Sequence, residues 1–243
     1  LYDKNNTQYI VDPTVNYGLP WERPENLINS FFFEFNSKRY NVKKVKANSG
    51  QSNYKIAENN IFIDSELKCI VKRKMKSSGF YNYSTRALLE NRETAKENMR
   101  DYWSAYFPDA RIDNLNIPED LFVKDLEYSY DFVTSSLVEE EYMTFKPLLE
   151  RLDIYESYGS IENIQYPILL NKTNIKRNNV FLFPEEFKIT DVPEDRIIDN
   201  DIYYAEIRFE LKGNEFHVMA GAKFKKEKVE VEWKKLNDLF SEV

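Results

Sequence analysis

The fold class of this chain is decided by residues 202–224, whose sequence is IYYAEIRFELKGNEFHVMAGAKF. Apolar and polar side chains alternate through residues 203–211 and again through residues 216–224, and Gly213-Asn214 lies between the two runs. A period of two is typical of a strand with one buried face, and a short Gly-Asn connection is typical of a hairpin. The stretch therefore predicts two antiparallel strands joined by a tight turn.

The same alternation recurs at residues 61–75 and 122–132, and in shorter runs at 26–35, 39–46, 163–170 and 178–183. These runs outnumber helical patterns, so we predict a mainly β protein made of β-sandwich-like units. We expect residues 26–136 to form a β-rich domain with an inserted helix, and residues 137–243 to form a C-terminal β-sandwich-like domain. The boundary near 137 is where an apolar strand pattern gives way to Glu139-Glu140-Glu141.

One segment follows a helical period instead. No Gly or Pro occurs from Ser84 to Phe107, and Pro108 follows directly. The spacing predicts one long helix over residues 84–107 that begins with Ser84 or Thr85 as its N-cap. Its apolar face comprises Leu88, Ala95, Met99, Trp103 and Tyr106. A second, short helix is expected at residues 233–242.

Charge and composition exclude several classes of protein. Lys and Arg number 34 against 41 Asp and Glu, which gives a net charge of −7 over 243 residues. Nucleic-acid binders carry a broad basic surface, so we expect no nucleic-acid partner. No apolar run reaches the roughly 20 residues of a membrane-spanning helix, so we expect no membrane span. The six glycines form no phosphate-binding motif, and we expect no cofactor.

Cys69 and His217 are the single cysteine and the single histidine of the chain. Cys69 lies in the apolar register of its strand, which predicts a buried and unreactive thiol. His217 lies in the polar register, which predicts a surface histidine. No disulfide within the chain and no thiolate–imidazole metal cluster is therefore expected.

Three other groups are candidates for binding. The acidic residues Glu194, Asp195, Asp199 and Asp201 could hold calcium, although a solvated acidic face is favoured and we expect no metal site. The lysines at 68, 72, 74 and 76 and the basic stretch 223–228 could bind a polyanion, although exposed strand lysines favour a simple solvent-facing surface. Tyr17, Trp21 and Phe31–Phe33 could form an aromatic platform for sugars or peptides. The alternative, which the period of two favours, is that these rings pack in the core.

Two N-terminal motifs resemble a known family. Ile10-Val11-Asp12-Pro13-Thr14 resembles the strand that closes the transglutaminase-like, papain-type catalytic core. Asn16–Pro20 is similar to the exit segment of bacterial transglutaminase-like proteins. Residues 1–25 are accordingly expected to be the terminal strand and exit segment of a truncated core.

The remainder resembles the C-terminal β-rich region (DUF3858-like) of the same proteins. The helix with Arg86 near its start and the strand in residues 107–113 are similar to that region. Residues 180–189 are also similar to that region, although Glu186 occupies a position where the family has glycine. The resemblance covers nearly the whole chain through short motifs in a matching order.

The resemblance implies that Asp12 occupies the position of the acid in a Cys-His-Asp triad. In the family the cysteine and histidine precede this acid, so Cys69 and His217 do not occupy catalytic positions. We expect a chain that is not an enzyme by itself. It would be a non-catalytic accessory or binding region of an exported, periplasmic or cell-surface protein, with the upstream core and a peptide or polysaccharide as partners.

Two alternatives remain open at the level of sequence. The first is a free-standing carbohydrate- or protein-binding β-sandwich protein at the cell surface, in which Trp21 and Tyr17 contact the ligand. The second is an enzyme that uses two carboxylates facing one another across a cleft.

Overall fold

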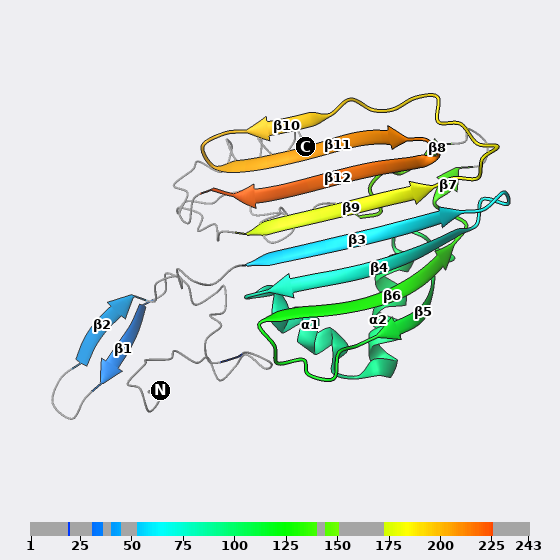
Figure 1. Ribbon diagram of the computed structural model, residues 1–243. Coiled ribbons are helices and arrows are strands. Elements are labelled where there is room, and N and C mark those ends of the chain that lie inside the picture. Colours follow the sequence, from blue (N-terminus) through cyan, green and yellow to red (C-terminus); the bar gives the residue numbers. More distant parts are fainter. Residues whose placement is uncertain are drawn as a thin grey trace.

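The computed structural model describes residues 19, 31–35, 40–44, 53–139, 144–150 and 173–225. Eight of its strands form one mixed sheet in the order β10-β11-β12-β9-β3-β4-β6-β5 (Figure 1). Their bounds are β3 Tyr54–Ile63, β4 Cys69–Ser78, β5 Arg111–Asn116, β6 Asp125–Thr134, β9 Asn174–Leu182, β10 Arg196–Asp199, β11 Tyr203–Lys212 and β12 Glu215–Phe224. The prediction of a mainly β fold is confirmed.

The sheet is continuous across the boundary expected near residue 137. β3 pairs in parallel with β9, and every other neighbouring pair in the sheet is antiparallel. This one parallel pair joins β3–β6 to β9–β12. Strands from both sides of that boundary therefore share the eight-stranded sheet, which is covered on one face, where the sequence led us to expect separate β-sandwich-like units. Local alternation could not show this, because it does not say which strands become neighbours.

The predicted hairpin at residues 202–224 is confirmed as β11 and β12. Lys212 pairs with Glu215, and Gly213 has a φ of 64° at the first position of the turn. Glycine tolerates this left-handed conformation without steric cost. The alternating run at residues 61–75, by contrast, contains a turn between β3 and β4. Leu67 in that turn has a φ of 61°, and the Asp64 carboxylate accepts hydrogen bonds from the backbone amides of Glu66 and Lys68.

The single helix expected over residues 84–107 is two helices, α1 (Tyr81–Leu89) and α2 (Arg92–Ser104). Asn91 separates them: its backbone is extended, and its side chain accepts hydrogen bonds from the amides of Glu93 and Thr94. The prediction of an N-cap at Ser84 or Thr85 is wrong, because both lie inside α1. The apolar spacing continues on both sides of Asn91, so it did not reveal that α1 ends before this residue and that α2 begins with Asn91 as its N-cap.

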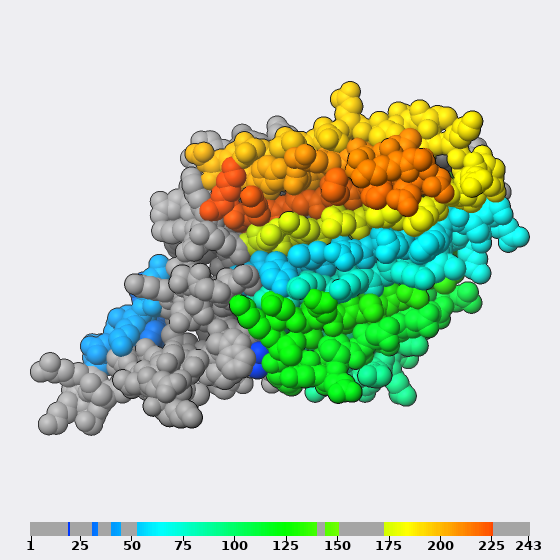
Figure 2. All heavy atoms as spheres, in the orientation of Figure 1, coloured from blue at the N-terminus to red at the C-terminus, as the bar shows by residue number. Residues whose placement is uncertain are grey.

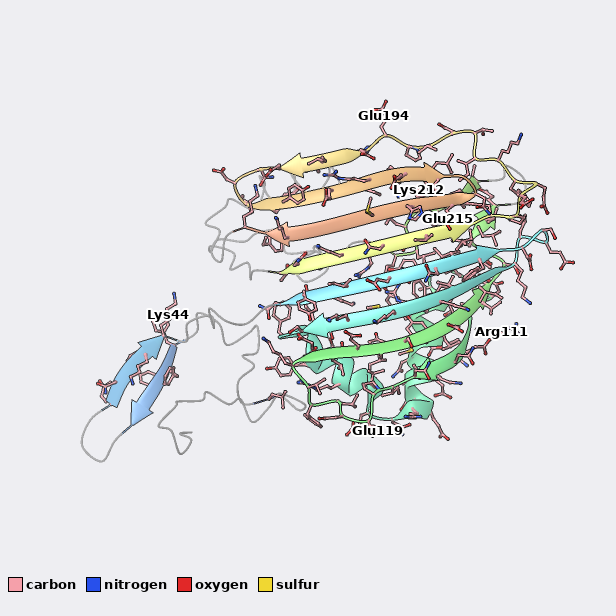
Figure 3. All side chains as sticks on the ribbon, viewed as in Figure 1. Lys44, Arg111, Glu119, Glu194, Lys212 and Glu215 are labelled. Carbon is pink, nitrogen blue, oxygen red and sulfur yellow. The ribbon has the colours of Figure 1, made fainter. Side chains whose placement is uncertain are left out.

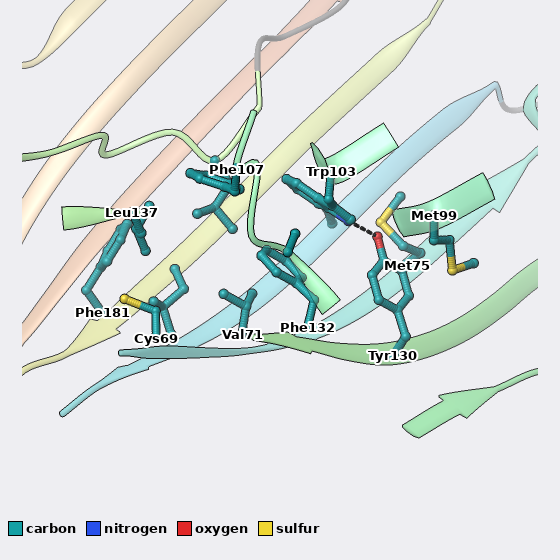
Figure 4. Packing of buried hydrophobic residues seen from close by; sticks show 14 of the residues in the cluster. Cys69, Val71, Met75, Met99, Trp103, Phe107, Tyr130, Phe132, Leu137 and Phe181 are labelled. Atoms are coloured by element: carbon teal, nitrogen blue, oxygen red, sulfur yellow. Dashed lines mark hydrogen bonds between the residues drawn. The ribbon is translucent and has the colours of Figure 1, made fainter. Parts of the chain in front are cut away.

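Both helices lie against one face of the sheet, behind β4, β6 and β5 (Figure 1). This inner face carries the core, in which the Trp103 ring stacks on Phe132 at 4.4 Å and donates a hydrogen bond of 2.8 Å to the Tyr130 hydroxyl (Figure 4). Figure 2 shows the opposite, outer face without a covering layer of described elements. The inner face of the sheet is therefore covered by helices, whereas no described element covers the outer face.

Two small antiparallel sheets accompany the large one: β1 (Phe31–Phe35) with β2 (Tyr40–Lys44), and β7 (Val138–Glu139) with β8 (Thr144–Phe145). β1 and β2 correspond in part to the runs expected at 26–35 and 39–46. The strand expected at 163–170 and the helix expected at 233–242 lie outside the described residues. No helix among the described residues is long and apolar enough to cross a membrane.

Candidate functional site

A cluster of polar side chains lies buried in the middle of the inner face. Arg73 on β4, Asn59 on β3, and Asn179 and Arg177 on β9 are each at most 3% exposed. Arg73 and Asn179 are both paired in register with Asn59, so the three side chains form a row across the sheet. Arg73 Nη1 donates to Asn59 Oδ1 at 3.1 Å, and Asn59 Nδ2 donates to Asn179 Oδ1 at 2.7 Å. Two arginines in a core require an acidic partner.

Glu150 supplies that partner, and we call it with Arg73 and Arg177 the Arg–Glu–Arg cluster. Glu150 Oε1 accepts a hydrogen bond from Arg73 Nη2 and lies 2.5 Å from Arg177 Nε as an ion pair without hydrogen-bond alignment. The other carboxylate oxygen accepts a hydrogen bond of 2.6 Å from the Tyr102 hydroxyl. Asn179 also donates to the Pro147 carbonyl at 2.9 Å. The sheet therefore holds Pro147 and Glu150, at the two ends of the segment 147–150, through polar contacts.

The electrostatics of the cluster follow from this geometry. Burial by itself raises the pKa of the Glu150 carboxyl, but the charges of Arg73 and Arg177 and the Tyr102 hydrogen bond outweigh burial and lower the pKa to about 2. Glu150 is the one buried carboxylate among the described residues. It is therefore held as an anion by two cations rather than poised to exchange a proton.

This depressed pKa predicts a specific loss of stability in acid. The folded-state pKa of Glu150 lies below its ordinary value of 4.5, so the contribution is complete above pH 4.5 and is lost as pH falls towards 2. The shift corresponds to roughly 3 kcal/mol. We expect the free energy of unfolding of wild type, minus that of Glu150→Gln, to shrink steadily between pH 5 and pH 2 in urea titrations. A difference that stays constant over that range would contradict the assignment.

The segment that the cluster holds forms one wall of an open cleft. The cleft has a volume of about 600 Å³ and lies between the β3–β4 turn, β7–β8 and the segment after β9. Its lining is mostly apolar and aromatic, with charged side chains in the segment after β9. The lining residues are Ile63, Leu67, Val138, Thr144, Phe145, Pro147, Phe183, Glu186, Phe187, Lys188, Ile189, Thr190, Asp191, Pro193 and Phe216.

Aromatic packing fixes the floor of the cleft. The ring of Phe145 lies 4.9 Å from that of Phe181, 5.3 Å from Phe183 and 5.7 Å from Phe216. Phe183 is also held through its backbone, since its amide donates to the Asn214 carbonyl at 3.1 Å. The cleft is thus a formed feature whose walls come from four separate parts of the chain.

A second hollow of about 490 Å³ adjoins the cleft and shares Phe183, Phe187, Lys188 and Ile189 with it. Its lining is completed by Glu185, by Leu211 near the end of β11, and by Gly213 and Asn214 in the β11–β12 turn. Figure 3 shows Lys212 and Glu215 on either side of this turn. β10 pairs only with Tyr204–Ile207 of β11. The edge of β11 beyond Ile207 therefore has no strand partner among the described residues, and it borders the hollow.

The candidate site residues fall into two groups, the Asp12 of the family resemblance with the aromatic candidates, and the single cysteine and histidine. Asp12, Tyr17 and Trp21 lie outside the described residues. Cys69 is fully buried, as predicted, and burial raises the pKa of its thiol to about 12. His217 is on the outer face of β12, half-buried, with Nε2 3.0 Å from a Glu215 carboxylate oxygen. Cys69 faces the core, so the sheet itself separates thiol and imidazole.

The acidic and basic stretches have ordinary roles in the described structure. Asp195 accepts a hydrogen bond of 2.8 Å from the Phe209 amide, Asp199 pairs with Lys225, and Glu194 projects outward (Figure 3). No grouping of three acidic, histidine or cysteine side chains suited to a metal ion occurs in the part of the chain described. On the outer face, Lys74 and Lys76 pair with Glu127 at 3.1 and 2.8 Å.

The buried cluster and the cleft were not predicted from the sequence. One signal was present: Arg73 stands in the apolar register between Val71 and Met75, opposite the exposed lysines. A cation in that register has to be paired when the strand is buried. Arg177 follows the same rule on β9, whereas Glu150 comes from a segment without a regular pattern.

No family model, curated protein or solved structure matches this chain.

Proposed function

We propose that the chain is a non-catalytic binding region whose cleft holds an extended peptide with apolar side chains. The observation that carries the proposal is the cleft of about 600 Å³ walled by Phe145, Phe183 and Phe187. Small-ligand and peptide sites are concave and mainly apolar, with a few polar groups that fix orientation. Glu186, Lys188 and Asp191 provide such groups in the lining.

The neighbouring strand edge supports a peptide rather than a sugar. The backbone amide of Phe209 points out of the edge of β11 that has no described strand partner, because it donates a hydrogen bond to Asp195 there. Backbone amides two residues apart on a strand point the same way, so the Leu211 amide points out of this edge too. An extended peptide can pair with such an edge through its main chain while its side chains enter adjacent hollows. Sugar sites need flat exposed rings with many hydrogen-bonding groups, whereas the rings of this cleft are tilted against one another.

The chemistry of the described residues supports a role without catalysis. The thiol of Cys69 is buried, and the carboxylate of Glu150 is neutralised by two arginines. The resemblance to the C-terminal region of bacterial transglutaminase-like proteins supports an accessory role beside such a core in an exported protein. In that setting the cleft would hold a peptide for the core upstream.

Peptide selection provides the test. Random twelve-residue peptides displayed on phage are selected on the wild-type chain, and the recovered peptides are measured by fluorescence polarisation. We expect apolar residues to be enriched, and we expect Phe187→Glu to weaken binding at least about tenfold, because it places a charge in the apolar cleft. Val192→Glu is the matched control, since Val192 is exposed and outside the lining. Equal binding to wild type and Phe187→Glu would reject the cleft as the site.

A further inference from the structure

We propose that the β1–β2 hairpin docks the protein on an anionic lipid surface. The hairpin pairs with no other described strand, and Figure 1 shows it beside the large sheet rather than within it. This inference does not depend on the peptide cleft, because it uses different residues and a different partner.

The hairpin exposes four large apolar side chains on one face. Phe31 is 68% exposed, Phe33 59%, Tyr40 66% and Val42 54%. Phe33 pairs with Val42 and Phe31 pairs with Lys44, so these side chains project from one face of the hairpin. A two-stranded hairpin is only marginally stable in water, and contiguous exposed apolar surface marks an interaction site.

Charge selects the partner of this face. Residues 31–46 contain five cations, Lys38, Arg39, Lys43, Lys44 and Lys46, against the single acidic residue Glu34. The rest of the chain is acidic enough to give the whole a net charge of −7. Lys44 lies at the end of β2, on the strand that also carries Tyr40 and Val42 (Figure 3). Aromatic rings beside lysines suit the headgroup region of a bilayer, where rings enter the acyl boundary and cations meet phosphate.

Other occupants fit these observations less well. A second copy of the chain would bring two basic hairpins together, which like charges oppose. Single-stranded nucleic acid needs open ring platforms for its bases. Here the Phe33 and Tyr40 rings are tilted by 59° against one another at 6.2 Å, and Val42 has no ring.

Vesicle flotation with the whole chain tests the proposal. The probes are vesicles of pure phosphatidylcholine and vesicles with about one third phosphatidylglycerol. We expect binding to the anionic vesicles only, weakened by salt, since each lysine near an anionic surface contributes several-fold to partitioning. Lys43→Glu/Lys44→Glu is expected to reduce partitioning at least about tenfold, and Phe33→Ser/Val42→Ser is expected to reduce it similarly.

The matched control is Lys72→Glu/Lys74→Glu on the outer face of β4, which changes the net charge equally at two exposed positions. It should retain most of the binding. Equal losses for the two lysine pairs, or equal binding to both vesicle types, would overturn the proposal. So would a hairpin-dependent dimer in sedimentation, or tighter hairpin-dependent binding to a single-stranded oligonucleotide than to anionic vesicles.

Discussion

Glu150→Gln is expected to lower the free energy of unfolding by about 3–5 kcal/mol at pH 7. The substitution keeps the size of the side chain but removes the charge that neutralises Arg73 and Arg177. Both guanidinium groups are buried, with side chains 2% exposed, so neither can recover water without opening the core. Urea unfolding followed by circular dichroism measures the effect.

Glu127→Gln is the control for this prediction. Glu127 also contacts two cations, Lys74 and Lys76, but its side chain is 41% exposed. Exposed ion pairs contribute about 0–1 kcal/mol, so the control should remain close to wild type. If the two variants lost the same stability, the Arg–Glu–Arg cluster would not have the role that we assign to it.

Trp103→Ala is expected to lower the free energy of unfolding by about 3–5 kcal/mol, because it removes the largest fully buried side chain of the core. The ring stacks on Phe132, lies 5.0 Å from the guanidinium carbon of Arg73, and donates to the Tyr130 hydroxyl. Its removal therefore leaves a cavity and an unpaired buried hydroxyl together. Urea denaturation of the variant gives the number directly.

Two further variants separate these causes. Trp103→Phe keeps a ring but loses the hydrogen bond, and it should fall between Trp103→Ala and wild type. Phe62→Ala removes a ring that is 39% exposed on the outer face, and it should cost about 1 kcal/mol or less. A loss below about 1 kcal/mol for Trp103→Ala would show that α2 does not pack on the sheet as described.

The sequence predicted what depends on local pattern. Alternation in residues 203–224 located β11, β12 and their turn, and alternation in residues 61–75 assigned Cys69 to the core. It could not show that β3 lies next to β9, because that parallel pair joins residues more than a hundred positions apart. Nor did the helical spacing reveal the break at Asn91, since apolar residues recur on both sides of it.

The candidate site was harder to predict than the fold, for a physical reason. The position of Arg73 in the apolar register of β4 predicts a buried charge, but this register does not predict which residue pairs with it. Glu150 lies 77 positions further along the chain. The cleft likewise depends on Phe145, Phe187 and Phe216, which come together only after the sheet has formed. Charge in the hairpin at residues 31–46, in contrast, is visible in the sequence.

Hydrogen exchange of the wild-type chain, with and without a selected peptide, tests the central claim most directly. We expect the peptide to slow amide exchange in residues 144–150 and 183–190, which wall the cleft, and at the β11 edge near Leu211. Exchange in β5 and β6 should stay unchanged. Protection confined to β5 and β6 or to the β1–β2 hairpin would contradict the cleft as the binding site.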